Sequence, residues 1–178
     1  RTQTVEATKT VKEQIGIRPG GTITIGNNDT SENIDPMITY FMLSYNVIHH
    51  AYENLVNRNE KTGKIIPNLA TEWDSPDGKV WTFKLRKDVT FRNGKKFTGN
   101  DVKFTFDRLI KAGTASGIFP FLEGVEVVDD YTVKFVNSKP YSPLDYQLIH
   151  PKSSIVPEVS AEDEEKFISE TFGSGPFQ

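Results

Sequence analysis

Apolar and polar side chains alternate strictly along residues 80–86. The apolar positions are Trp81, Phe83 and Leu85, and polar or charged residues stand between them. Alternation with a period of two predicts an antiparallel strand with one buried face. Positions 75–78 read Ser-Pro-Asp-Gly, which is typical of a tight turn. We therefore expect a half-buried strand that the chain enters through a turn.

The hydrophobic period changes to that of a helix after Thr98. Thr98 and Asp101 have the spacing of a capping box, with Asp in place of the usual Glu, and Gly113 stands where such a helix would end. Between these signals, the apolar residues fall on one helical face: Val102, Phe106, Leu109 and Ile110. We expect this face to be buried against the strand at 80–86.

Further patterns predict the remaining elements of the fold. In chain order they are a strand at 22–25, a helix with the stripe Phe41, Tyr45, Ile48, Tyr52 and Leu55, a hairpin at 56–66, a hairpin at 125–135, a short helix at 142–148, an extended segment at 155–157 and a helix at 160–171. The sum is an α+β fold in which antiparallel hairpins pack with helices on one side.

Composition narrows the classes of function. The 178 residues are 36% apolar and 25% charged, which is ordinary for a globular protein, and the formal net charge is −3. This charge provides no electrostatic reason to bind nucleic acid. The chain has no cysteine and no run of about 18 apolar residues, so we expect no thiolate chemistry and no membrane-spanning helix.

The sequence contains no recognisable catalytic or metal-binding pattern. His49 and His50 are adjacent, so on a helix their side chains would point about 100° apart and would hold a metal ion poorly. The Asp129-Asp130 pair is explained by a hairpin turn. No serine or threonine lies in a motif that supplies a base. We therefore expect neither enzymatic activity nor a cofactor.

Several short motifs occur together and in a fixed order. They include Ile34-Asp35-Pro36, Tyr52-Glu53-x-Leu55, Leu69-Ala70-x-x-Trp73, Trp81-Thr82-Phe83-x-Leu85-Arg86, Val89-x-Phe91-x-Asn93-Gly94, Asp101-Val102-x-Phe104-x-Phe106 and Gly173-x-Gly175-Pro176-Phe177. In this order and spacing, the chain resembles the family 5 extracellular solute-binding proteins of ABC importers, which include oligopeptide-, dipeptide- and nickel-binding proteins. The resemblance extends over residues 20–178.

The resemblance implies part of a two-lobed, periplasmic-binding-protein-like fold. Residues 20–178 would form the N-terminal part of lobe I. The rest of lobe I and all of lobe II would come from a remainder of the receptor that this chain lacks. Residues 1–19 are polar, have no apolar signal-peptide core and are followed by Gly20-Gly21, which predicts an N-terminal tether.

The resemblance also indicates which segments of lobe I line the solute cleft. They are the loop after the first strand with the helix that follows it, the segment before the hairpin at 125–135, and the loop before residues 155–157. These segments supply the candidate ligand-binding residues Asn27, Asn28, Asp29, Tyr40, Tyr45, Phe119, His150, Lys152 and Ser153. Asparagine amides suit peptide-like or sugar ligands, and aromatic rings supply apolar contact.

Some of these candidates have a plain alternative role. Tyr45 belongs to an apolar stripe, so core packing is an equal alternative. Of Phe119 and Phe121, which flank a proline, we expect at least one in the core. Lys152 would pair with a ligand carboxylate, or it is an ordinary surface lysine. Trp73 and Trp81 fit the strand pattern and are expected in the core rather than at a ligand.

The implied function is that of an extracytoplasmic receptor that binds a small solute, with peptides favoured, and delivers it to the transmembrane subunits of an ABC permease. The implied location is periplasmic or extracellular, with lipid anchoring to the outer face of the cytoplasmic membrane as one form. Two alternatives stay open. One is a receptor of the same family for an oligosaccharide or a nickel chelate, and the other is an isolated lobe-like domain that binds a protein and transports nothing.

Overall fold

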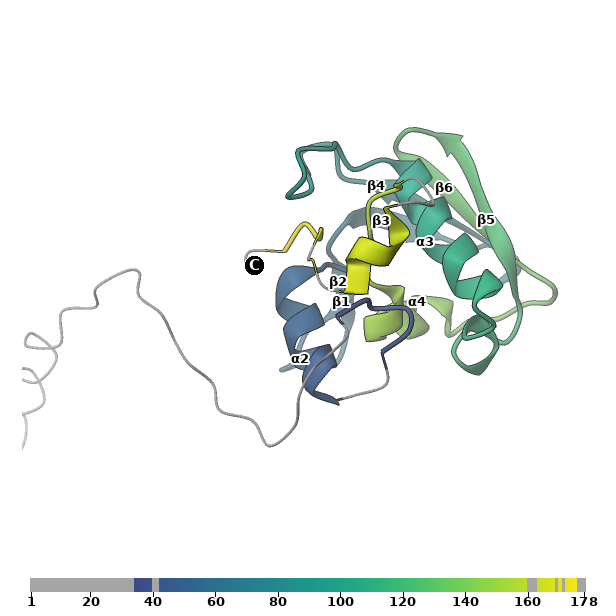
Figure 1. Ribbon diagram of the computed structural model, residues 1–178. Helices are drawn as coiled ribbons and strands as arrows, with labels where there is room; N and C mark the ends of the chain where they lie inside the picture. The colour runs from purple at the N-terminus through teal and green to yellow at the C-terminus, as the bar shows by residue number, and fades with distance from the viewer. Residues whose placement is uncertain (1–33, 40–41, 160–162, 169, 171, 176–178) are drawn as a thin grey trace, which may run out of the picture.

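The computed structural model describes residues 34–39, 42–159, 163–168, 170 and 172–175. The predicted strand at 22–25 and the predicted tether lie outside these residues. The described chain forms a four-stranded antiparallel sheet with a helix beneath it, a separate two-stranded hairpin, and a second group of short elements to one side (Figure 1).

The four-stranded sheet has the strand order β3-β4-β6-β5 and no parallel pair. Its strands are β3 (Ala70–Asp74), β4 (Val80–Leu85), β5 (Leu122–Asp129) and β6 (Thr132–Asn137). The predicted alternation is confirmed, because Trp81, Phe83 and Leu85 are buried on one face of β4. The predicted hairpin at 125–135 is also confirmed, and it turns after Asp129.

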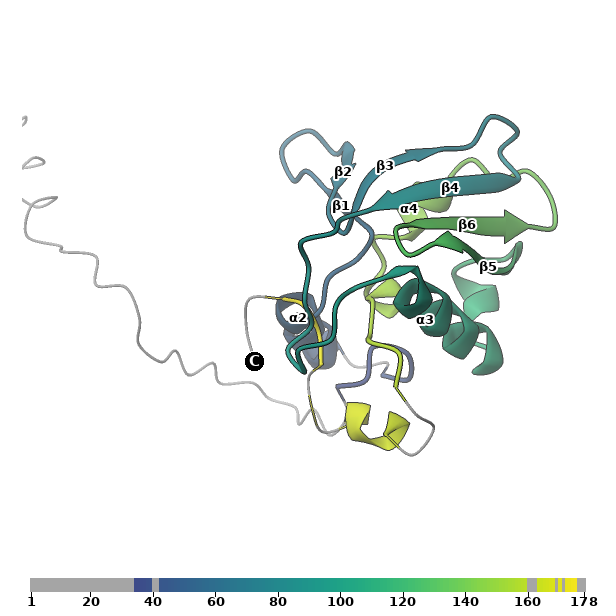
Figure 2. The ribbon, with the colours of Figure 1, turned by 90° about the horizontal axis from the view of Figure 1, so that it is seen from above.

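Helix α3 (Gly99–Lys111) lies beneath this sheet (Figure 2). The capping box is present, with the Thr98 amide donating to Asp101 Oδ2 over 2.8 Å. The amide of Gly99 donates to Asp130 O over 2.7 Å, and a Cβ at position 99 would stand 2.9 Å from Val133 Cγ1. Glycine at the start of the helix therefore permits close packing against the β5–β6 turn.

Aromatic rings fill the space between the sheet and α3. Phe106 lies edge-on to both Phe135, with centroids 4.7 Å apart, and Phe119, at 5.5 Å. Phe83 contacts Phe135 from the other side at 5.2 Å. These four rings are at most 2% exposed. The expectation that Trp81, Phe83, Leu85, Val102, Phe106 and Leu109 share one core is confirmed.

A second, smaller core lies beside the first. Helix α2 (Met42–Ala51) supplies Ile48 and Ala51, which pack with Tyr52, Val156 and Phe167. The predicted helix was expected to reach Leu55, but α2 ends at Ala51. Tyr52 and Leu55 are nevertheless buried, because the chain beyond the helix runs inward.

The remaining elements are short. β1 (Val56–Arg58) and β2 (Ile65–Pro67) form the predicted hairpin at 56–66, and α4 (Leu144–Gln147) is a shorter version of the helix expected at 142–148. Single 3-10 turns are η1 (Ala115–Gly117), η2 (Pro151–Ser153) and η3 (Glu164–Ile168). The expectation of an α-helix at 160–171 is wrong for its described part, since residues 164–168 form a 3-10 helix.

The chain returns to α2 near its described end. The amide of Gly175 donates to Ala51 O over 3.0 Å, and a Cβ on Gly173 would collide with the same carbonyl group. Arg92 clamps this contact, because its amide donates to Gly173 O and its Nη2 donates to Gly175 O. Both glycines are thus required by close backbone approach.

Candidate functional site

Asn54 organises the candidate site by linking the end of α2 to the loop that carries η2. Its Nδ2 donates to Leu148 O over 2.9 Å and to His150 O over 3.1 Å. Its Oδ1 accepts a hydrogen bond of 2.9 Å from Ser154 Oγ. The side chain is 8% exposed, so these bonds are made where water does not compete well. Asn54 therefore fixes the path of residues 148–154.

This link brings Tyr45 next to His150. Their ring centroids are 6.1 Å apart with an interplanar angle of 79°, and Tyr45 Oη donates to Thr39 O over 3.2 Å. Both side chains are partly buried and partly exposed. Tyr45 also packs against the smaller core. The structure confirms the packing role of Tyr45 and leaves part of its side chain exposed.

A hydrogen bond at one ring nitrogen of His150 fixes the tautomer of its neutral imidazole. Its Nδ1 accepts a 3.1 Å hydrogen bond from the amide of Lys152, so the proton of the neutral ring is on Nε2. Burial lowers the pKa of His150, and the nearby positive groups Lys152 and His49 lower it further. The ring is therefore neutral near pH 7 and offers an N–H donor at Nε2.

Lys152 and Ser153 differ from what their sequence context indicated. Lys152 is only 4% exposed, so it is not a surface lysine. Ser153 is 1% exposed, and its Oγ lies 2.6 Å from His150 O and 2.9 Å from Leu148 O. The Ser153 hydroxyl thus serves the loop itself, and this candidate ligand-binding residue presents no exposed hydroxyl in the structure.

Phe119 also lies away from any open surface. It is 2% exposed and packs edge-on against Phe106, so it offers no free face for stacking. The neighbouring Phe121 is partly exposed, contacts Tyr141 at 5.3 Å and carries Lys139 Nζ 3.9 Å above its ring. The expectation that at least one of the two rings is core is confirmed, and Phe119 is that ring. Asn27, Asn28, Asp29 and Tyr40 lie outside the described residues.

The sequence did not point to a polar cavity of about 190 Å³ beside the site. It is lined by His49, Tyr52, Glu53, Asn54, Asn57, Asn68 and Ile149. The one sequence signal for it was Asn54, an amide that follows Glu53 and directly precedes the apolar pair Leu55-Val56. A polar side chain in such a stretch is usually buried and hydrogen-bonded, as the structure confirms.

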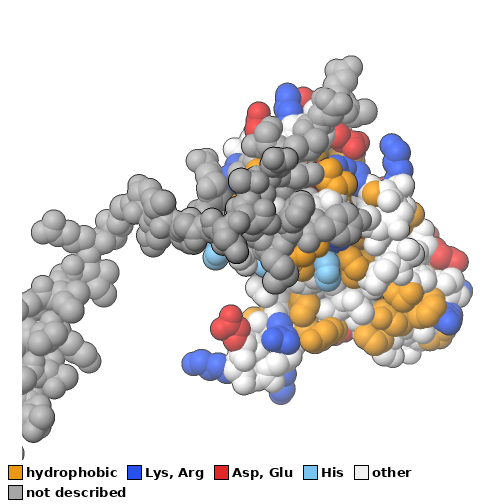
Figure 3. Space-filling view, turned by 60° about the horizontal axis from the view of Figure 1, so that its bottom comes forward, with side chains coloured by type: hydrophobic (Ala, Val, Ile, Leu, Met, Phe, Trp, Pro, Cys, Tyr) orange, Lys and Arg blue, Asp and Glu red, His pale blue; other side chains and the backbone are white. Residues whose placement is uncertain are grey.

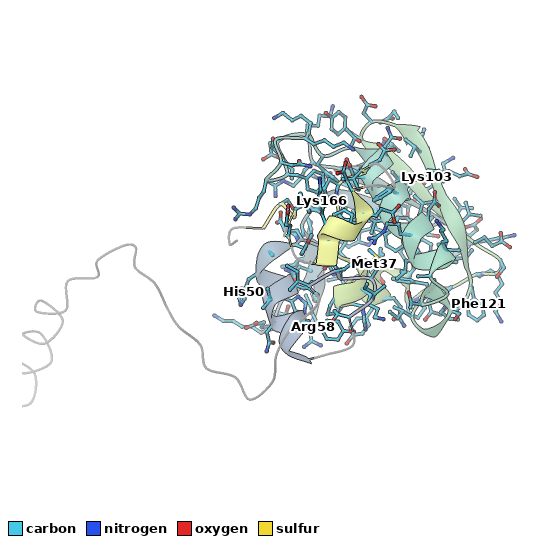
Figure 4. The ribbon with its side chains drawn as sticks, in the orientation of Figure 1. Met37, His50, Arg58, Lys103, Phe121 and Lys166 are labelled. Carbon is cyan, nitrogen blue, oxygen red and sulfur yellow. The ribbon has the colours of Figure 1, made fainter. Side chains whose placement is uncertain are left out.

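His49 and His50 stand side by side in the last turn of α2. His49 and His50 are both exposed, and His50 lies on the side of α2 turned away from the four-stranded sheet (Figure 4). Although His49 is exposed as a residue, its imidazole is partly desolvated, and this desolvation and the neighbouring His50 lower its pKa. Over the described residues there is no group of three or more His, Asp or Glu side chains that could hold a metal ion.

The face of the molecule that carries the histidines has hydrophobic, histidine and charged side chains. Figure 3 shows histidine side chains close to clusters of hydrophobic side chains, with a separate charged projection at one edge. In the described part of the chain, no helix is both long enough and apolar enough to cross a bilayer. The arrangement can donate hydrogen bonds and supply aromatic contact, which is the chemistry of binding.

Comparison with known proteins agrees with this chemistry. Residues 64–178 match the family described as bacterial extracellular solute-binding proteins, family 5 Middle. The chain is 32% identical over 171 residues to the "Probable D,D-dipeptide-binding periplasmic protein DdpA" of Escherichia coli K12, covering 89% of this chain and 33% of that protein. The chain thus spans about a third of the length of such relatives.

Two solved structures share the fold. One is titled a nickel ABC transporter from Bacillus halodurans, with a TM-score of 0.73 and 32% identity over 84% of this chain and 30% of that one. The other is the ABC transporter-associated periplasmic binding protein DppA from Helicobacter pylori in complex with peptide STSA. It has a TM-score of 0.72 and 29% identity over 82% of this chain and 34% of that one.

Proposed function

Because this chain belongs to the bacterial extracellular solute-binding proteins of family 5, we propose that it is the N-terminal part of lobe I of a receptor that binds peptides outside the cytoplasm. The receptor would hold its solute between two lobes and deliver it to the transmembrane subunits of an ABC permease. The observation that carries the choice of peptide is the 32% identity with a dipeptide-binding protein over 89% of this chain.

The geometry around α2 and η2 supports a peptide as the solute. His150 presents a neutral N–H donor beside the ring of Tyr45, and such a pair can serve a peptide carbonyl and an adjacent apolar side chain. Neither group carries a full charge near pH 7, so recognition would depend on the peptide backbone rather than on side-chain charge. The outer location and lipid anchoring belong to the same proposal.

A nickel chelate is the second candidate, favoured by the likeness to the structure titled a nickel ABC transporter. The described residues offer it no cluster of metal-binding side chains. A receptor for a chelate could bind the organic part instead, so the two solutes must be separated by measurement. An oligosaccharide receptor and a lobe-like domain that binds only a protein remain the further alternatives.

The test is to identify what co-purifies with the receptor that contains this chain. Native mass spectrometry should detect a mixture of short peptides, and elemental analysis should detect no stoichiometric nickel. Tyr45→Ala should reduce peptide occupancy on the order of tenfold, as expected for losing about 1.4 kcal/mol of binding. Tyr146→Ala is the matched control, because Tyr146 is 49% exposed and lies on α4. A single oligosaccharide, or one nickel ion per protein, would rule out the peptide proposal.

A further inference from the structure

The turn at Asn93-Gly94 offers a chemistry that the candidate site does not use. It is the only position among the 178 residues at which glycine follows asparagine. Both residues are exposed in the loop between β4 and α3. Among the described residues, the Nδ2 of Asn93 has no hydrogen-bond partner, so no contact holds this group back from leaving. Glycine has no side chain, so its main-chain nitrogen can approach the side-chain carbonyl carbon of the preceding asparagine.

The conformation of the turn both favours and restrains such an approach. Gly94 has a φ of 83°, and a Cβ at this position would meet no atom within 4 Å, so the surroundings of Gly94 are open. Asn93 Oδ1 accepts a 3.0 Å hydrogen bond from the amide of Lys95, which draws electron density away from Cγ. The amide of Gly94, however, donates to Phe91 O over 2.9 Å and is held in place. The turn must therefore open before the nitrogen can attack, and exposed loops open locally at a small fraction of the cost of global unfolding.

We propose that Asn93 is a site of spontaneous deamidation, limited by the opening of its turn. In the open turn, the main-chain nitrogen of Gly94 forms a bond to Asn93 Cγ, and the bond from Cγ to Nδ2 breaks. The proton of the Gly94 amide leaves with Nδ2 as ammonia, and a succinimide ring remains. Water then opens the ring. Cleavage of the bond from nitrogen to Cγ gives aspartate, whereas cleavage of the bond from nitrogen to the main-chain carbonyl carbon gives isoaspartate. The reaction consumes only water, and it does not depend on the proposed transport role.

Deamidation bears on the clamp that Arg92 forms on the returning chain. Arg92 donates from its amide to Gly173 O and from Nη2 to Gly175 O. Figure 2 shows this loop beside that part of the chain, near α2. Aspartate at position 93 keeps the backbone path, whereas isoaspartate inserts an additional carbon into the backbone directly after Arg92. We therefore expect isoaspartate, but not aspartate, to loosen the clamp.

The reaction can be followed by incubating the whole chain in mildly alkaline buffer and analysing its peptides by mass spectrometry. Asn59 is the matched internal control, because its Oδ1 also accepts hydrogen bonds from backbone amides in a turn, but glutamate follows it. Deamidation should be about tenfold or more faster at Asn93 than at Asn59, which corresponds to a barrier lower by about 1.4 kcal/mol. Equal rates at the two positions, or no deamidation at Asn93, would overturn the proposal.

Two further comparisons identify the reacting residue and the role of the turn. Asn93→Gln keeps a neutral amide but would have to close a larger, less favourable ring. Labelling of the peptide that contains residue 93 by an isoaspartyl methyltransferase should therefore be lost, and labelling retained there would overturn the proposal. A synthetic peptide of residues 89–97 cannot hold the Gly94 amide as the folded turn does, so it should deamidate faster than the folded chain. Equal rates in the peptide and the chain would contradict the limit set by the turn.

The effect on the clamp can be measured by hydrogen exchange of the Gly175 amide, which donates to Ala51 O over 3.0 Å. In a chain incubated until isoaspartate has accumulated, NMR should show severalfold faster exchange of this amide in the isoaspartate form. Asn93→Asp is the control, because it carries the charge of the product without the additional backbone carbon, and its exchange rate should match that of the unchanged chain. Equal exchange in the isoaspartate form and in Asn93→Asp would overturn the expected loosening of the clamp.

Discussion

The larger core and the smaller core of this protein are built in different ways. The larger core is centred on β3 to β6 and α3, elements that follow one another between Ala70 and Asn137, although residues from outside this range, such as Met37, Leu55 and Ile155, also join it. The smaller core gathers α2, the stretch around Val156 and η3, which are far apart in the chain. The hydrogen bond from Thr105 Oγ1 to Val156 O connects the two cores across 51 positions. Local periodicity therefore specifies the first core, and specific polar contacts assemble the second.

The strongest test of the larger core is Phe106→Ala. The Phe106 ring is fully buried and contacts both Phe119 and Phe135, so its removal should leave a cavity. The free energy of unfolding should fall by about 3–5 kcal/mol, measured by urea denaturation. Phe121→Ala is the control, because that ring is partly exposed, and its effect should be clearly smaller. Equal losses in both variants would contradict the assignment of Phe106 to the core.

The smaller core should respond to alkaline pH through Tyr52. Burial raises the pKa of Tyr52 to about 12. Its folded pKa exceeds the usual value near 10, so its contribution to stability is complete below pH 10 and is lost as the pH rises toward 12. The free energy of unfolding should fall by at most about 3 kcal/mol over this range of pH. In Tyr52→Phe the free energy of unfolding should change less with pH over this range. In Tyr146→Phe it should change with pH as it does in the unchanged protein.

The smallest expected effect concerns the junction that Asn54 forms. Asn54→Ala removes the donor to Leu148 O and His150 O and the acceptor for Ser154 Oγ. Unfolding should become easier by on the order of 2 kcal/mol, and the resonances of residues 148–154 should broaden or shift. Asn57→Ala is the control, since Asn57 is exposed and, among the described residues, its side chain accepts a hydrogen bond only from the amide of Arg58. Unchanged resonances of residues 148–154 in Asn54→Ala would show that this loop keeps its conformation without the Asn54 side chain.

The sequence predicted the larger core well because each of its elements carries its own signal. Residues 80–86 alternate, the capping box marks the start of α3, and Gly113, which has a φ of 71°, marks its end. Each signal lies within a few residues of the element that it specifies. Short connections explain the pairing of β3 with β4 and of β5 with β6, whereas β4 and β6 pair across α3 and β5, a contact that no local signal specifies.

The smaller core and the candidate site were harder to predict because their contacts are distant in sequence. Tyr52 and Leu55 continue the spacing of the α2 stripe, yet the helix ends before them, so periodicity alone placed that end wrongly. Ser153 and Phe119 have residue types suited to a ligand, but tertiary contacts bury them. Asn54 bonds to a carbonyl 94 positions away, and no local pattern announces such a partner.

The backbone contact between Gly175 and Ala51 has a topological consequence. The chain leaves Ala51, builds the sheet, α3 and both cores, and returns to the same carbonyl group. Residues 52–172 are therefore a closed excursion whose entry and exit points adjoin, as they do in inserted domains. The excursion is held to α2 by more than its two ends, because Ile48 and Ala51 of α2 pack against Val156 and Phe167 within it.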